Sequence, residues 1–161
     1  MTNLKIEFYL KLILLVSLVS IISAYFIEYV LGYQPCNLCL IERIPYGLSI
    51  ILITFNYFFK KKEKFIILLL ILTFFFSFAI SVYHFGIEQG LFEESGICGL
   101  KDSTGIISKE EILKQLQEKT VSCKDVTFRI FGLSLTSINI LLSLILITLL
   151  TKTYNSYEKN K

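Results

Sequence analysis

The chain has 161 residues, of which 54% are hydrophobic and 18% are charged, and its mean hydropathy is +0.66. This composition is too apolar for an ordinary soluble domain. The net charge of +3 is modest and gives no indication of nucleic-acid binding. The apolar residues also occur in long blocks, which is typical of a membrane protein and argues against a soluble all-helical core.

Four of these blocks are long enough to cross a bilayer, because about 20 helical residues span a hydrocarbon core of ~30 Å. The first block is longer than the apolar region of a secretory signal, usually about 7 to 15 residues, so we expect a retained helix. The predicted fold is an all-α membrane protein, a four-transmembrane-helix antiparallel bundle forming a single domain over residues 1–161. Its predicted spans are residues 12–31, 40–59, 65–85 and 133–150.

Small side chains that would allow close helix contact are sparse, and the first and third spans carry several of them. Such residues let two membrane helices approach each other closely. We therefore interpret them as helix-packing positions: Ser17, Ser20, Ser23 and Ala24 in the first span, and Ser77, Ala79 and Ser81 in the third.

The distribution of lysine and arginine predicts the orientation. The N-terminal segment, the connector at residues 60–64 and the C-terminal tail together carry nine basic and three acidic residues. The opposite side has a short turn at residues 32–39 without a basic residue, and a long loop at residues 86–128 with five lysines and eight acids. Both termini are therefore expected in the cytoplasm, and all four cysteines on the outside, where disulfides persist.

The long outer loop contains one predicted element. The sequence Ser108-Lys109-Glu110-Glu111 has the form of a capping box, and apolar residues follow it at helical spacing. We expect a short amphipathic helix over residues 109–119, lying on the membrane surface or on the mouth of the bundle.

The four cysteines form two pairs on this outer side. Cys36 and Cys39 make a CxxC motif at the start of the second span, and Cys98 and Cys123 lie in the long loop. Backbone N–H groups and the dipole at a helix N-terminus stabilise a thiolate. Arg43 lies four residues after Cys39, on the same helical face. It is expected to favour the thiolate or an anionic reduced acceptor, or else to pair with Glu42, Glu28 or a lipid headgroup.

Several kinds of cysteine site remain open at this point. A zinc site would lack a second histidine, because His84 is the only one in the chain. A structural disulfide between Cys98 and Cys123 would leave Cys36 and Cys39 unexplained. A relay of thiol–disulfide exchange between the two pairs accounts for all four residues.

Electrons that enter such a relay need an acceptor. The sequence has no haem-attachment, flavin or nicotinamide motif, whereas a lipid-soluble quinone docking near the outer helix ends requires no nucleotide-binding fold. His84 lies at the outer end of the third span, at the expected depth of Cys39 and Arg43. It either donates a hydrogen bond to a quinone carbonyl or is an interfacial histidine that contacts lipid or a backbone carbonyl.

The segment Gln34-Pro35-Cys36-Asn37-Leu38-Cys39-Leu40-Ile41-Glu42-Arg43 resembles the P-C-x-L-C-x-x-[EQ]-R motif of the DsbB family of disulfide-bond formation proteins. The resemblance continues through His84, a second cysteine pair about 25 residues apart, and the segment Phe131-Gly132-Leu133-Ser134-Leu135. The vitamin K epoxide reductase family also has four helices and two cysteine pairs, but its CxxC belongs to the last helix of the bundle.

The resemblance implies a membrane protein-dithiol:quinone oxidoreductase of the bacterial inner membrane. It would reoxidise a periplasmic thiol oxidase of the DsbA type and pass the electrons to ubiquinone or menaquinone. Cys98 would be attacked by the partner's thiolate, and Cys123 would exchange with Cys36. Cys39 would be the thiolate in contact with the quinone, with Arg43 stabilising the developing charge and His84 as a supporting quinone contact.

One departure from the family concerns a tryptophan that some members carry shortly after the second loop cysteine. This chain has no tryptophan, and Phe128 is the nearest aromatic residue. Two other functions remain as alternatives. One is a membrane protein with regulatory or structural disulfides and no quinone turnover, and the other is a small metal-binding or transport protein.

Overall fold

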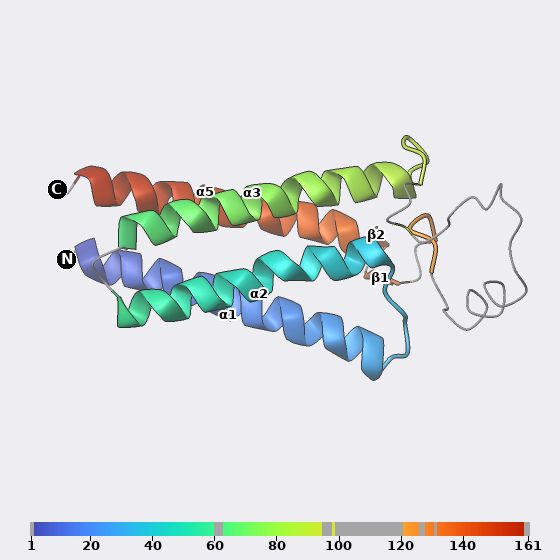
Figure 1. Ribbon diagram of the computed structural model, residues 1–161, viewed down its shortest axis with the longest axis horizontal. Coiled ribbons are helices and arrows are strands. Elements are labelled where there is room, and N and C mark those ends of the chain that lie inside the picture. Colours follow the sequence, from blue (N-terminus) through green and yellow to red (C-terminus); the bar gives the residue numbers. More distant parts are fainter. Residues whose placement is uncertain are drawn as a thin grey trace, which may run out of the picture.

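The computed structural model describes residues 2–59, 63–94, 98, 121–125, 128–130 and 132–159. Within them, four long helices run alongside one another as a bundle (Figure 1). All four are long and apolar enough to cross a membrane, which confirms the predicted all-α, four-helix membrane fold. The amphipathic helix expected over residues 109–119 lies outside the described part of the chain. The helices are α1 (Thr2–Tyr29), α2 (Asn37–Phe58), α3 (Glu63–Glu88) and α5 (Leu135–Lys159).

The two chain ends lie at one end of the bundle, and the start of α2 and the segment before α5 lie at the other (Figure 1). The largest interface joins α3 to α5, whereas α1 and α5 share a small one. In Figure 1, α1 diverges from the other helices towards the end where α2 begins. Residues of α1, α2 and α5 line a pocket at that end of the molecule.

Helix α1 is longer at its start than the predicted span of residues 12–31. Its apolar stretch begins at Ile6, and the charged residues there are accommodated because Lys11 pairs with Glu7 at 3.1 Å, one turn apart. The helix ends at Tyr29. Gly32 has a φ of 77°, a conformation that glycine adopts readily, and the chain turns there towards α2.

Helices α2 and α3 are also longer than the spans predicted from hydropathy. Helix α2 begins at Asn37 rather than Leu40, because the Cys36 sulfur accepts the N–H of Cys39 at 3.3 Å and acts as the N-cap. Helix α3 continues to Glu88, after which the chain reverses at Gly90, whose φ is 73°. Each extension brings polar residues into the end of the bundle where α2 begins.

A two-stranded hairpin precedes the last helix. Strand β1 (Arg129–Ile130) pairs antiparallel with β2 (Leu133–Ser134), and Gly132 turns the chain with a φ of 84°. The Ser134 hydroxyl accepts the N–H of Ser137 at 3.2 Å and caps α5. This cap makes the helix begin at Leu135 rather than at residue 133, and α5 then runs to Lys159, beyond the expected end at residue 150.

The small residues of the spans have three different environments. Ser17 of α1 accepts a hydrogen bond from Ser49 of α2 at 2.7 Å, and Ser77 of α3 accepts one from Ser143 of α5 at 3.2 Å. These serines therefore pack helices together, as predicted. Ser81 is likewise buried. The packing prediction was wrong for Ala79, whose side chain is exposed on α3. Ser20, Ser23 and Ala24 line a pocket described below.

Candidate functional site: two cysteine pairs and a buried histidine

Cys36 and Cys39 form a free dithiol in the first turn of α2. Their sulfurs are 2.8 Å apart, because an N-cap residue and the third residue after it lie on the same side of a helix start. The Cys36 side chain is buried, and that of Cys39 is partly exposed. The prediction that both lie at a helix N-terminus is confirmed.

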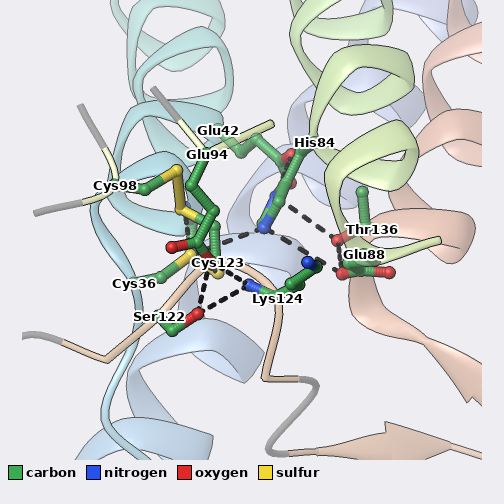
Figure 2. Close-up of a disulfide and its surroundings, with 11 residues drawn as sticks. Cys36, Glu42, His84, Glu88, Glu94, Cys98, Ser122, Cys123, Lys124 and Thr136 are labelled. Atoms are coloured by element: carbon green, nitrogen blue, oxygen red, sulfur yellow. Dashed lines mark hydrogen bonds and ion pairs between the residues drawn. A yellow bond between two sulfur atoms is a disulfide. The ribbon is translucent and has the colours of Figure 1, made fainter. Parts of the chain in front are cut away.

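Cys98 and Cys123 are joined by a disulfide. Both are buried, and they pack with Cys36, Leu38 and Ile87 in one cluster at the end of the bundle. Figure 2 shows this disulfide beside Cys36. The structure therefore brings all four cysteines together, with the oxidised pair next to the reduced one.

A carboxylate fixes the segment that carries Cys123. Glu94, which follows α3, accepts hydrogen bonds from the Ser122 hydroxyl and from the Lys124 backbone N–H, the latter at 2.9 Å. These contacts lie on both sides of Cys123 (Figure 2). The loop disulfide is thus attached to the end of α3. No motif in the sequence predicts this role of Glu94.

His84 lies between Cys36 and a carboxylate. Its Nε2 atom is 3.5 Å from the Cys36 sulfur, and its Nδ1 atom is 2.9 Å from Glu42 Oε1. The imidazole is only 2% exposed, so these partners replace water around it. A carboxylate, an imidazole and a thiol are therefore arranged in series, and thiol-dependent enzymes use this order to activate a sulfur.

The Glu42 carboxylate is itself held in place. Asn139 of α5 donates to Glu42 Oε2 at 3.0 Å and to the Ser81 hydroxyl at 2.7 Å, and it accepts from Tyr46. Glu42 belongs to the longer motif that contains the CxxC pair and was predicted as a partner of Arg43, whereas Asn139 was not among the predicted site residues. The available signal was the polar character of both residues within apolar helices, which marks a functional position by default.

The surroundings of Cys36 favour its thiolate. A hydrogen bond from the Cys39 thiol lowers the pKa of Cys36 most, and His84 lowers it further. Burial acts in the opposite direction, but the pKa of Cys36 still falls to about 5. These contacts therefore favour the thiolate form of Cys36.

A pocket of about 320 Å³ opens between α1, α2 and α5. Its walls are mainly apolar, and Cys39 is the single described cysteine that lines it. Arg43 also lines this pocket, where it forms an ion pair with Glu28 and lies 5.2 Å from the centre of the Tyr25 ring. Of the partners expected for Arg43, the structure thus shows Glu28.

A second, smaller pocket of about 40 Å³ adjoins the dithiol. Cys36, Cys39, Cys123, His84 and Glu88 line it. Cys39 therefore contacts both pockets, whereas His84 lines the small one and not the large one. A quinone contact by His84 stays a prediction, and the geometry associates this residue with Cys36 instead.

The comparisons with known proteins identify the family of the chain. The family model described as "Disulfide bond formation protein DsbB" matches residues 7–152. An uncharacterised protein of Rickettsia prowazekii (strain Madrid E) is 30% identical over 146 residues, covering 88% of this chain and 84% of that protein. No solved structure matches the chain. The matched region includes all four cysteines, His84 and the whole CxxC segment, and the chain therefore belongs to the DsbB family of disulfide bond formation proteins.

Proposed function

We propose that this chain is a membrane thiol:quinone oxidoreductase that reoxidises a DsbA-type thiol oxidase. Membership of the DsbB family indicates an oxidoreductase of disulfide formation, and the acceptor and partner are our inference. One observation carries the proposal: Cys39 lines both the small pocket beside the loop cysteine Cys123 and the large apolar pocket. A sulfur in this position links the loop disulfide to an acceptor held between α1, α2 and α5.

The exchange steps are those that the resemblance to the DsbB family implies for these four cysteines. A thiolate of the reduced partner attacks Cys98, breaking the loop disulfide and releasing Cys123 as a thiolate. The partner's second thiolate then resolves the mixed disulfide, so the partner leaves oxidised and the loop pair is reduced. With Cys36 and Cys39 oxidised, Cys123 attacks Cys36 and releases Cys39 as a thiolate beside the large pocket. Cys98 finally attacks Cys123, which restores the loop disulfide and leaves Cys36 and Cys39 reduced.

The large pocket suits a quinone head group. Its volume is at the lower end of the about 300–1,000 Å³ typical of small-molecule sites. The side chains of Gln34 and Arg43 line it and supply N–H donors for carbonyl oxygens. When bound, ubiquinone or menaquinone accepts the two electrons and two protons that the dithiol loses on becoming a disulfide.

His84 and Arg43 have separate tasks in this scheme. His84, oriented by Glu42, holds the proton that Cys36 loses on ionisation and stabilises its thiolate. Arg43 supplies positive charge at the wall of the large pocket, where negative charge develops on the acceptor. The basic residues near both termini support a cytoplasmic position for these ends and an extracytoplasmic, periplasmic position for the cysteines.

A pocket-filling substitution tests the proposal. Ala24 lines the large pocket, so Ala24→Phe should lower quinone reduction strongly, with exchange between the loop disulfide and the partner retained. Ala79→Phe is the matched control, because Ala79 is exposed on α3 and the same added volume projects away from the bundle. Equal quinone turnover by both variants, each shown to be folded, would contradict the assignment of this pocket to the acceptor.

A further inference from the structure

We propose that the reduced dithiol is also a zinc site, in which Cys36, Cys39 and His84 bind one Zn²⁺ ion and hold the relay in its reduced state. The two sulfurs and one imidazole nitrogen lie within 4.8 Å of one another. Thiolate and neutral imidazole are the ligands that zinc prefers in proteins. The cluster uses the single histidine of the chain, and the loop cysteines take no part because their sulfurs are already bonded to each other.

The distances fit a tetrahedral ion with little movement. Zn–S bonds of ~2.3 Å and Zn–N bonds of ~2.0 Å place a sulfur and a nitrogen ligand roughly 3.5 Å apart. The Cys36 sulfur and His84 Nε2 are 3.5 Å apart. Two sulfur ligands are roughly 3.8 Å apart in the same geometry, so the cysteine sulfurs must separate by about 1 Å from their present 2.8 Å. A side-chain rotation of Cys39, which is less buried than Cys36, is sufficient for this.

The orientation of His84 is that of a metal ligand. Zinc-binding histidines usually donate their second ring N–H to a carboxylate, which fixes the ring and leaves the other nitrogen free to bind the ion. Glu42 takes this position, 2.9 Å from Nδ1, and Asn139 holds the carboxylate through its other oxygen. Nε2 is consequently directed at the two sulfurs.

Glu88 lies beside the group formed by Cys36, Cys39 and His84 but outside it, and a movement of its side chain towards the ion would supply a fourth ligand. Its Oε1 atom lies 4.0 Å from His84 Nε2 and accepts from Thr136. Its Oε2 atom is buried and has no hydrogen-bond partner, although the side chain is only 6% exposed. An unpaired buried carboxylate oxygen is costly, and this one borders the small pocket next to both cysteines. Zinc in that pocket would give Oε2 a partner and complete the coordination.

Such a site exists in one redox state only. When Cys36 and Cys39 form a disulfide, neither sulfur can bind the ion as a thiolate, so zinc affinity is confined to the reduced protein. Bound zinc would withhold both thiolates from exchange and from the acceptor. The loss of turnover on zinc binding rests on the proposed function, whereas the binding of zinc to the reduced dithiol does not.

Equilibrium binding of Zn²⁺ tests the site without any turnover. The purified full-length protein, with the loop disulfide intact and Cys36 and Cys39 reduced, is titrated with Zn²⁺ against a chromophoric chelator. One ion per chain should bind, and no ion at this site after oxidation of Cys36 and Cys39. Cys39→Ser should weaken binding at least about 100-fold, and Glu88→Gln about 10- to 100-fold. Glu93→Gln, which alters an exposed carboxylate after α3, should leave the affinity unchanged.

Two results would overturn the zinc site: no stoichiometric binding by the reduced protein at micromolar Zn²⁺, or equal binding by the oxidised protein or by Cys39→Ser. A separate assay adds Zn²⁺ to reduced protein that is turning over quinone, and a chelator should restore the rate. Stoichiometric binding without loss of turnover would keep the zinc site and refute its inhibitory effect. Binding in a protein that never reduces quinone would refute the proposed function alone.

Discussion

The imidazole of His84, on α3, joins the Cys36 sulfur to the Glu42 carboxylate, with distances of 3.5 Å and 2.9 Å on its two sides. Cys36 caps the start of α2 and Glu42 lies in its second turn, and a single side chain from a neighbouring helix connects them. The relationship assigns the only histidine of the chain to the dithiol rather than to the large apolar pocket. It also predicts how the dithiol responds to pH and to substitution.

Cys36 should react as a thiolate at pH values far below the usual pKa of a thiol. Its pKa of about 5 means that the thiolate predominates above pH 5 and is lost as the pH falls through this value. Glu42→Gln should raise the pKa of Cys36, because a neutral amide holds a protonated imidazole less well. The measurement is the rate of Cys36 alkylation against pH in the reduced protein with a chelator present, read by mass spectrometry. An unshifted profile in Glu42→Gln would refute the role of this carboxylate.

Arg43→Ala should reduce quinone turnover by about 100-fold, because a preorganised positive charge at the pocket wall is lost. Glu28→Gln should produce a smaller loss, since Glu28 only orients the guanidinium. Steady-state quinone reduction with a reduced partner gives both values. The rate of the first exchange between partner and loop disulfide serves as an internal control and should not change. A loss confined to that exchange step would place Arg43 outside the acceptor site.

Glu94→Ala should slow the transfer between loop and helix by about 10-fold, because the segment around Cys123 loses its anchor to α3. In a Cys39→Ser, Cys98→Ser background, Cys36 and Cys123 are the only remaining cysteines. Formation of their disulfide after a mild oxidant can then be followed by acid quenching and gel electrophoresis. Glu93→Ala is the control, as its exposed side chain neighbours Glu94 in sequence. Equal rates in both variants would remove Glu94 from the relay.

Ser134→Ala should destabilise the protein by about 1 kcal/mol, the usual effect of removing a helix N-cap. The Ser134 hydroxyl accepts the Ser137 N–H at the start of α5, next to the hairpin. Reversible unfolding in mixed micelles measures the change in free energy. Thr148→Ala removes an exposed hydroxyl that bonds only its own helix, so its effect should be smaller. An equal loss of stability in both variants would contradict the capping role.

A thiol reagent that cannot cross the membrane tests the proposed orientation. After reduction, Cys98 and Cys123 should react when the reagent is added from the periplasmic side of intact spheroplasts. Inverted vesicles should protect both cysteines until detergent is added. Labelling in the inverted vesicles alone would reverse the topology and refute a periplasmic partner.

The helices were predictable from hydropathy, but their ends were not. A window of apolar residues locates a span, whereas the ends depend on single groups that hydropathy does not weigh. The Cys36 sulfur caps α2 at Asn37, and the Ser134 hydroxyl sets the start of α5 after a hairpin of four paired residues. At the start of α1, the Lys11–Glu7 pair lets charged residues join an otherwise apolar helix.

The gathering of the cysteines was equally predictable, since the spans that flank the loop and the CxxC motif meet at the same end of the bundle. The contacts of His84 and Arg43 were not predictable, because they depend on how each helix is rotated about its axis. Rotation of α3 turns His84 towards Cys36, and the position of α1 selects Glu28 as the partner of Arg43. Neither rotation can be read from the spacing of residues within one helix.

The central claim is that electrons leave the dithiol through Cys39. The most direct test is anaerobic quinone reduction by the purified protein, supplied with a reduced DsbA-type partner and short-chain ubiquinone or menaquinone analogues. The account predicts one quinol for each partner disulfide formed by the wild-type chain, and none by a folded Cys39→Ser variant. Wild-type turnover in Cys39→Ser, or no turnover by the folded wild-type chain with either quinone, would contradict it.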